Sequence, residues 1–399
     1  MHSSDEILSY EPFSKTWRIR KTKGEIPPRT LGASGVCLEN SFYIFGGQHG
    51  HPDEKDFVEG NNNEIYELNL KTLAWKKLNF DANISPLPTE KSLMTSHTNF
   101  LYIFGGYSES PEDFKFYPIK PKYEHDSSSS YQWPRGWNGS LTRYDLSKNK
   151  WEFLKNCPAS ARAGHAGDKT GTNHWVIFGG RSRSTRLNDV IMYDLNNDTW
   201  TVIDPGYQPE LLYYLDRDEP LGTVATQDGK KFPEPRSGHS FDFIGEGKFF
   251  LYGGIGMLNS PLNDAWILRI TSDLQAIWIP YPLDYDHGFG RCLHSSLYFQ
   301  SSQLLIHSGC TQEFFNHQLD LNDHTETILT FDFGVKSLFQ LALEFVEKKF
   351  PISDFDLQVP LAIQNTMKCR LKLDNEEIRF RPLIDCEPLF QRSILHSGL

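Results

Sequence analysis

Residues 175–180 read WVIFGG, an apolar run that ends in a pair of glycines, and the pattern recurs along the chain. It appears as FYIFGG at 42–47, LYIFGG at 101–106 and FFLYGG at 249–254, with a degenerate copy, LLIHSGC, at 304–310. Short apolar runs that are rich in aromatic and β-branched residues and bounded by turn residues predict β-strands rather than helices. Five copies of one unit therefore predict a modular, all-β fold.

Each copy is followed by a second strand, such as VIMYDL at 190–195, and four of these lead into a strand with a tryptophan: Trp75, Trp151, Trp200 and Trp278. An Arg-x-x-His motif precedes three of the copies, beginning at Arg162, Arg236 and Arg291. These features resemble the kelch repeat, in which four antiparallel strands make one blade of a β-propeller. The resemblance implies that the aromatic residues fill the wedges between neighbouring blades.

The two ends of the repeat array are irregular. Segment 6–22, EILSYEPFSKTWRIRKT, resembles the third and fourth strands of a blade without its first two, and the fifth copy lacks a tryptophan strand. We therefore predict an all-β kelch β-propeller of the six-bladed type, with one incomplete blade, over residues 6–335. A small α-helical segment at 336–370 and a C-terminal tail at 371–399 are expected to follow it.

Composition limits the function. The 399 residues include 14% aromatic and 23% charged residues, which is typical of a folded globular protein. No apolar run of eighteen residues and no secretory signal are present, so we expect no membrane partner and an intracellular, nuclear or cytoplasmic location. A net charge of -11 argues against a nucleic-acid partner. The scattered cysteines and the lack of a ligand constellation predict no metal, no cofactor and no catalytic residues.

After residue 336 the period changes. The stretch SLFQLALEFVEKKF, 337–350, places apolar residues at helical spacing, and a helix packed on the propeller would explain it. The stretch also resembles the BC box through which substrate receptors bind Elongin C, and this implies contacts from Leu338, Ala342 and Val346. A second pattern further on resembles the Cullin-2 box, with valine in place of the usual leucine: Val359, Pro360, Ile363 and Met367.

The stretch FGGRSRSTRLND, 178–189, gathers positive charge in an acidic chain. Arg181 and Arg186 fall in a loop between two strands, which is predicted to reach the same mouth of the propeller as Ser237. Two guanidinium groups and a hydroxyl would suit a carboxylate, because arginine donates a rigid fork of charge-assisted hydrogen bonds. The alternative is a solvated loop whose arginines pair with Asp189 or with nearby carboxylates.

Together with RSGHS at 236–240 and RGWN at 135–138, this stretch resembles the kelch-repeat substrate receptors of Cullin-2 RING ubiquitin ligases, which recognise proteins that end in glycine. The resemblance implies that Arg181, Arg186 and Ser237 hold the terminal carboxylate of the substrate. It implies a pocket wall made by Tyr107, Trp137, Lys91 and Arg135. It also implies Elongin B/C, Cullin-2 with its RING protein, and the C-termini of substrate proteins as partners.

Three points stay open. Gly238 stands where those receptors carry a tryptophan, so a preference for a carboxylate is firmer than a preference for terminal glycine. A propeller that binds a small carboxylate or an acidic sugar, or a general protein-interaction scaffold, would also fit the residues. The last residues, Ser397-Gly398-Leu399, suggest self-association through the tail, which would enter the pocket in cis or in a neighbouring molecule.

The insert 108–133 is expected to be a long loop beside Tyr107.

Overall fold

The computed structural model describes residues 5–11, 16–49, 60–80, 84–111, 118–128, 134–171, 173–204, 223–225, 231–283, 290–299, 303–311, 325 and 327–333. Every strand or helix assigned within these ranges is a β-strand, and none of these residues forms a helix long and apolar enough to cross a membrane. The predicted BC box, the predicted Cullin-2 box and the C-terminal tail lie outside the described residues.

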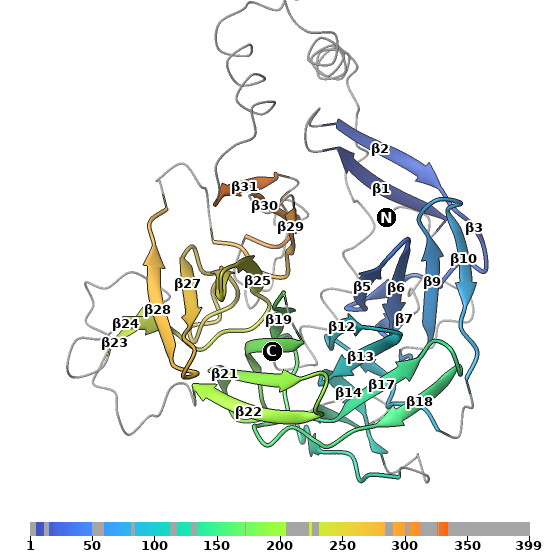
Figure 1. Cartoon of the computed structure of the whole chain (residues 1–399), viewed down its shortest axis with the longest axis horizontal. Coiled ribbons are helices and arrows are strands. Elements are labelled where there is room, and N and C mark those ends of the chain that lie inside the picture. The colour runs from blue at the N-terminus through green and yellow to red at the C-terminus, as the bar shows by residue number, and fades with distance from the viewer. Residues whose placement is uncertain are drawn as a thin grey trace, which may run out of the picture.

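Five antiparallel sheets are arranged around one axis as the blades of a propeller, with the first strand of each blade innermost (Figure 1). Blade one contains β5 (Ser34–Leu38), β6 (Ser41–Phe45), β9 (Ile65–Asn69) and β10 (Ala74–Lys77), with β3 (Lys23–Gly24) parallel to β10. Blade two contains β12 (Leu93–His97), β13 (Phe100–Phe104), β17 (Leu141–Asp145) and β18 (Lys150–Phe153). Blade three contains β19 (Ala166–Lys169), β20 (His174–Arg181), β21 (Arg186–Asp194) and β22 (Thr199–Asp204). Blade four contains β25 (Ser240–Gly245), β26 (Lys248–Tyr252), β27 (Ala265–Ile270) and β28 (Ala276–Tyr281). Blade five has three described strands, β29 (Ser295–Phe299), β30 (Gln303–His307) and β31 (Leu329–Asp332).

A hairpin lies between blade one and blade five. Strands β1 (Glu6–Glu11) and β2 (Thr16–Lys21) pair in antiparallel fashion, as the sequence predicts for this segment. On one side, Ile7 packs against the apolar cluster of blade one. On the other side, the ring of Trp17 lies 4.8 Å from the ring of His307 on β30. The hairpin therefore contacts both ends of the array of blades.

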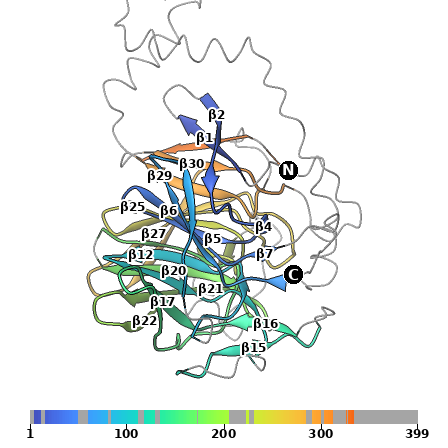
Figure 2. The same cartoon turned by 90° about the vertical axis from the view of Figure 1, so that its right-hand side faces the viewer.

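Three small sheets complete the described elements. One joins β11 (Thr89–Glu90), β14 (Tyr107–Glu109), β16 (Arg135–Asn138) and β15 (Tyr123–His125), and another joins β4 (Thr30–Leu31), β7 (Gln48–His49) and β8 (Gly60–Asn61). The third is a hairpin of β23 (Thr223–Ala225) and β24 (Lys231–Pro233). Figure 2 shows β4, β7, β15 and β16 together on one side of the blades. The prediction of an irregular loop over 108–133 is thus partly wrong, because two stretches of it pair with β16.

The tryptophans fill the wedges between blades, as predicted. Trp151, Trp200 and Trp278 each pack on a phenylalanine in the second strand of the preceding blade, with ring centroids 5.5, 5.0 and 4.9 Å apart. Each apolar cluster at these boundaries draws residues from two adjacent blades. Since burial of one large aromatic side chain stabilises a fold by roughly 2–3 kcal/mol, the blade boundaries hold much of the stability.

The glycine pairs allow adjacent blades to approach closely. Gly179 and Gly180 have φ angles of +62° and +101°, and the amide of Gly180 donates to the carbonyl of Arg236 in the next blade at 2.8 Å. A Cβ atom at Gly179 would lie 2.9 Å from the same carbonyl oxygen, so only glycine fits without strain. The glycine pair of one blade and the Arg-x-x-His motif of the next therefore form one structural unit.

The arginines of these motifs are buried and paired. Arg162 donates from both terminal nitrogens to the carboxylate of Asp189, at 2.7 Å each. Arg236 makes the same bidentate contact with Asp264, at 2.6 and 2.7 Å. In blade five a threonine, Thr327, accepts from the corresponding arginine instead. Such pairs are costly to break, because a single buried charge would remain.

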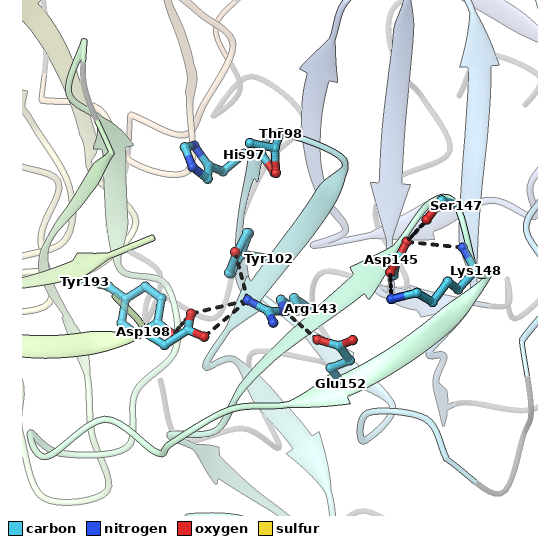
Figure 3. A network of polar contacts seen from close by, with 10 residues as sticks. All are labelled: His97, Thr98, Tyr102, Arg143, Asp145, Ser147, Lys148, Glu152, Tyr193 and Asp198. Atoms are coloured by element: carbon cyan, nitrogen blue, oxygen red, sulfur yellow. Dashed lines mark hydrogen bonds and ion pairs between the residues drawn. The ribbon is translucent and has the colours of Figure 1, made fainter. Parts of the chain in front are cut away.

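The far end of the blades has its own polar network, shown in Figure 3. Arg143 of blade two donates to Glu152 at 2.7 Å and to the hydroxyl of Tyr102 at 3.3 Å. It also reaches Asp198 of blade three at 3.3 Å, where the hydroxyl of Tyr193 donates to the same carboxylate at 2.9 Å. The positive charge at this end is therefore neutralised by carboxylates.

Candidate functional site

The two arginines predicted to bind a carboxylate lie opposite each other. They are register partners at the end of the β20–β21 hairpin of blade three. The backbone of Arg181 exchanges two hydrogen bonds with Ala163, at 2.9 and 3.0 Å, in the segment that leads into blade three. The next residue after Arg186, Leu187, forms a bridge to Arg236 in the segment that leads into blade four. The hairpin is thus held between two inter-blade segments.

Arg186 is a buried guanidinium without a carboxylate partner. Its side chain is 6% exposed, Nε donates to Oγ of Ser237 at 3.3 Å, and Nη1 donates to Oδ1 of Asn259 at 2.6 Å. Its other terminal nitrogen, Nη2, is buried and has no hydrogen-bond partner among the residues that the structure describes. Burial, and then the charge of Arg181, lower its pKa to about 10. Both effects show that this site holds positive charge that an anion would stabilise.

Arg181 adds a second positive charge. Burial lowers the pKa of its guanidinium, whereas Asp126 and Tyr107 act in the opposite direction. Asp189 is not their partner, because both oxygens of that carboxylate accept from Arg162. The effect of Asp126 on Arg181 agrees with the other part of the alternative prediction, a nearby carboxylate. Arg183, the third arginine of the stretch, is exposed in the turn. The buried Arg186 is therefore separate from the structural ion pairs described for the blades, whereas the half-buried Arg181 lies near the carboxylate of Asp126.

The predicted aromatic wall forms beside Arg181. Tyr107 and Trp137 are direct partners on β14 and β16, with ring centroids 5.4 Å apart in an edge-to-face arrangement. Both side chains are buried and pack with Ala163, whose backbone bonds Arg181. The hydroxyl of Tyr107 donates to the carboxylate of Asp126 at 2.8 Å. Tyr107 and Trp137 thus form one side of the site, and the hydrogen bond from Tyr107 fixes the carboxylate of Asp126 near Arg181.

The two remaining predicted residues, Arg135 and Lys91, lie in segments that flank this site. Arg135 is fully buried on β16, and its carbonyl accepts from the amide of Asp126 at 2.8 Å. Lys91 has a left-handed backbone, and its Nζ lies 3.6 Å from the carboxylate of Glu90. The structure therefore brings Arg181, Arg186 and Ser237 together with the aromatic wall, and gives Arg135 a position in the support beneath it.

A chain of backbone hydrogen bonds links the inter-blade segments. The chain runs from Gly32 through Lys91, Gly164 and Gly238 to Leu293, and each amide after Gly32 donates to the carbonyl of the preceding member, at 2.7 to 3.0 Å. All five have left-handed φ angles between 54° and 67°. We call these five residues the inner ring. Gly238 follows Ser237 directly, so the inner ring lies next to the arginine pair.

Comparison with known proteins agrees with this architecture. Residues 2–210, just over half of the chain, match the family model described as the KLHDC2/KLHL20/DRC7 Kelch-repeats domain. The chain belongs to this kelch-repeat family. Kelch domain-containing protein 2 of Bos taurus is 29% identical over 350 residues, which cover 86% of this chain and 76% of that protein. Kelch domain-containing protein 1 of Mus musculus is 28% identical over 381 residues, 92% of this chain and 82% of that protein. The kelch assignment from the glycine pairs and tryptophans is confirmed.

Three polar residues around the arginine pair were not predicted from the sequence as parts of the candidate site. Asp126 binds Tyr107, Asn259 accepts from Arg186, and the carboxylate of Glu234 is close enough to act on the pKa of Arg186. Each lies outside the repeated motif, in a connecting segment. The sequence offers one weak signal, since Glu234 stands two residues before an Arg-x-x-His motif.

Proposed function

We propose that this kelch-repeat protein is the substrate-recognition subunit of a Cullin-2 and Elongin B/C ubiquitin ligase. In this role it binds the C-terminal carboxylate of a substrate protein and presents that protein for ubiquitination and degradation inside the cell. The observation that carries the proposal is the buried Arg186, which has two neutral partners and no carboxylate within ion-pair distance among the described residues. A substrate carboxylate would supply the missing charge.

The geometry favours a carboxylate for physical reasons. A carboxylate has two oxygens that can accept from the guanidinium of Arg186, from Arg181 and from the hydroxyl of Ser237. Burial strengthens these contacts, because water competes less for the charges. With a net charge of -11 on the whole chain, Arg181 and Arg186 together make a local positive site in an acidic protein. The choice of terminal glycine, in contrast, rests on the resemblance alone.

Peptide binding tests the carboxylate. A fluorescent peptide that ends in Gly-Gly is titrated with purified protein, beside its C-terminally amidated form and a form with terminal alanine. We expect amidation, Arg181→Ala and Arg186→Ala each to weaken binding at least about tenfold, since each removes a charge-assisted contact. Arg183→Ala, an exposed arginine in the same hairpin, is the matched control and should change affinity less than about twofold.

The outcome separates the competing functions. Equal binding of the acid and amide peptides would contradict a carboxylate receptor and would favour a scaffold that reads internal segments. Competition by free acetate or glucuronate at the same concentration as peptide would favour a small-molecule site. We propose no catalytic step on this chain in any of these cases.

The ligase assembly is tested separately through the C-terminal segment. If Leu338 inserts into a pocket of Elongin C as a BC-box leucine does, Leu338→Asp should abolish co-purification of Elongin C and leave peptide affinity unchanged. Equal recovery of Elongin C with the variant would refute this part of the proposal. A substitution in the Cullin-2 box, Pro360→Ala, should keep Elongin C and weaken the capture of Cullin-2.

A further inference from the structure

A loop of blade four is fixed against the arginine pair. Ile255 exchanges backbone hydrogen bonds with Ser237, at 2.7 and 3.2 Å. The amide of Met257 donates to the carboxylate of Glu234 at 3.0 Å, and Asn259 accepts from Arg186 at 2.6 Å. Because the loop is held at three points, its side chains have a defined position relative to the guanidinium of Arg186.

This loop exposes large apolar side chains next to a charged site. Met257 is 42% exposed and Leu258 is 69% exposed. Leu293, a member of the inner ring, is 40% exposed and follows Cys292, which is close enough to act on the pKa of Arg186. We call Met257, Leu258 and Leu293 the apolar rim. Exposed apolar residues that cluster beside a polar site are typical of a binding surface.

The inner ring presents backbone atoms beside this rim. Gly164 and Gly238 present backbone only, and a Cβ atom at Gly164 would make ordinary contacts of 3.6 Å and 3.7 Å with Gly238 and Ser237. At Gly238 the neighbouring surface is apolar, because a Cβ atom there would lie 2.8 Å from Cδ2 of Leu293. A carboxylate held by Arg186 near Ser237 would therefore place the adjoining Cα close to Leu293.

We propose that the site prefers substrates whose last residue carries an aliphatic side chain, which packs on the apolar rim while the terminal carboxylate binds the arginines. The inference rests on the proposed carboxylate function and specifies the substrate class. A terminal glycine would leave the rim exposed to water, and a terminal aspartate would bring a second negative charge against apolar groups at an energetic cost.

The test uses peptides that differ only in the last residue: glycine, alanine, leucine or aspartate, each with a free carboxylate, and the leucine peptide also as an amide. Affinity should increase from glycine through alanine to leucine, with leucine bound about tenfold more tightly than glycine, as expected when an apolar side chain enters an apolar site. Aspartate should bind more weakly than glycine.

Two variants separate the rim from the rest of the fold. Leu258→Ser with Leu293→Gly removes two of the three rim side chains, and glycine is well suited to position 293 because φ is +54° there. Leu274→Gly is the matched control, since Leu274 is also 40% exposed, has φ of +61°, and lies in the turn at the far end of blade four. The double variant should reduce the preference for leucine over glycine to less than about twofold, and the control should keep it at about tenfold.

The possible failures are distinguishable. Glycine bound as tightly as leucine, with both lost on amidation, would overturn this inference and leave the carboxylate function standing. A preference for leucine that persists in the double variant would also overturn it. Leucine peptides that bind equally as acid and amide, or no binding by any peptide, would refute the proposed function and this inference together.

Discussion

Arg186→Met should leave the stability of the fold nearly unchanged while it abolishes carboxylate binding. Burial and Arg181 lower the pKa of the guanidinium from 12.5 to about 10, which means that the charged form is disfavoured in the folded state. At neutral pH the group is charged in both the folded and the unfolded chain, so this shift destabilises the fold by about 3 kcal/mol. Methionine has similar length and no charge. It would forgo the hydrogen bonds from the charged guanidinium to Ser237 and Asn259, worth about 1.5 kcal/mol each, so the two effects cancel to within about 1 kcal/mol.

Urea denaturation at pH 7.5, with the unfolding slope checked for constancy, measures this difference. The matched control is Arg162→Met, which breaks the bidentate pair with Asp189 and should destabilise the fold by about 3–5 kcal/mol. The two substitutions are chemically identical, and both side chains are buried. If Arg186→Met destabilised the protein as strongly as Arg162→Met, Arg186 would be a structural residue, and the argument for a vacant carboxylate site would fail.

Three further predictions test other parts of the structure. Tyr107→Phe removes a donor from a buried carboxylate and should cost about 1–3 kcal/mol in urea denaturation, together with a several-fold loss of peptide affinity; unchanged stability would contradict it. Gly253→Ala would place Cβ 2.3 Å from a backbone carbonyl of the next blade and should cost more than about 3 kcal/mol, whereas Gly245→Ala, at φ +96° with open space, should cost only about 1–2 kcal/mol from backbone strain. Stability should also fall as pH drops below 6.5, because burial lowers the pKa of three histidines, His165, His239 and His294. The unfolded chain then binds protons before the folded chain does, and each histidine lowers the free energy of unfolding by about 1.4 kcal/mol per pH unit. Burial raises the pKa of Asp242 to about 7 and opposes this trend, so a net loss of about 2 kcal/mol is expected from pH 7.5 to 5.5; a rise in the urea midpoint would refute it.

The blades could be predicted because each repeat carries a complete local rule. The repeats carry glycine at a left-handed position, a tryptophan on the outer strand and an arginine three residues before a histidine, and contacts between neighbouring blades require all three. At Gly180, for example, the amide meets the carbonyl of Arg236. The small sheet of β14, β15 and β16 could not be predicted in this way. Its strands have only three or four residues, too few for an alternating pattern to appear.

The site was predictable only in part, because its parts come from different segments. Arg181 and Arg186 share one hairpin and were found together, but Asp126 reaches them from an insert and Asn259 from a loop of the next blade. No spacing rule relates these positions. The role assigned to Arg135 was carried by resemblance, and in this structure its backbone supports Asp126 while the side chain is fully buried.

The partners of each arginine separate the structural arginines from the binding ones. Arg162 and Arg236 each bind an aspartate of the blade that follows, Asp189 and Asp264, so both of these carboxylates already have an arginine partner. Arg186 is also buried, but among the described residues it donates only to a hydroxyl and an amide oxygen. A fold gains little from a charge held in this way, because the cost of desolvation offsets what two neutral partners return. An anionic ligand would add a charged partner for Arg186 and so outweigh the cost of desolvation. The apolar rim beside Arg186 then favours, among anionic ligands, those that carry an aliphatic group.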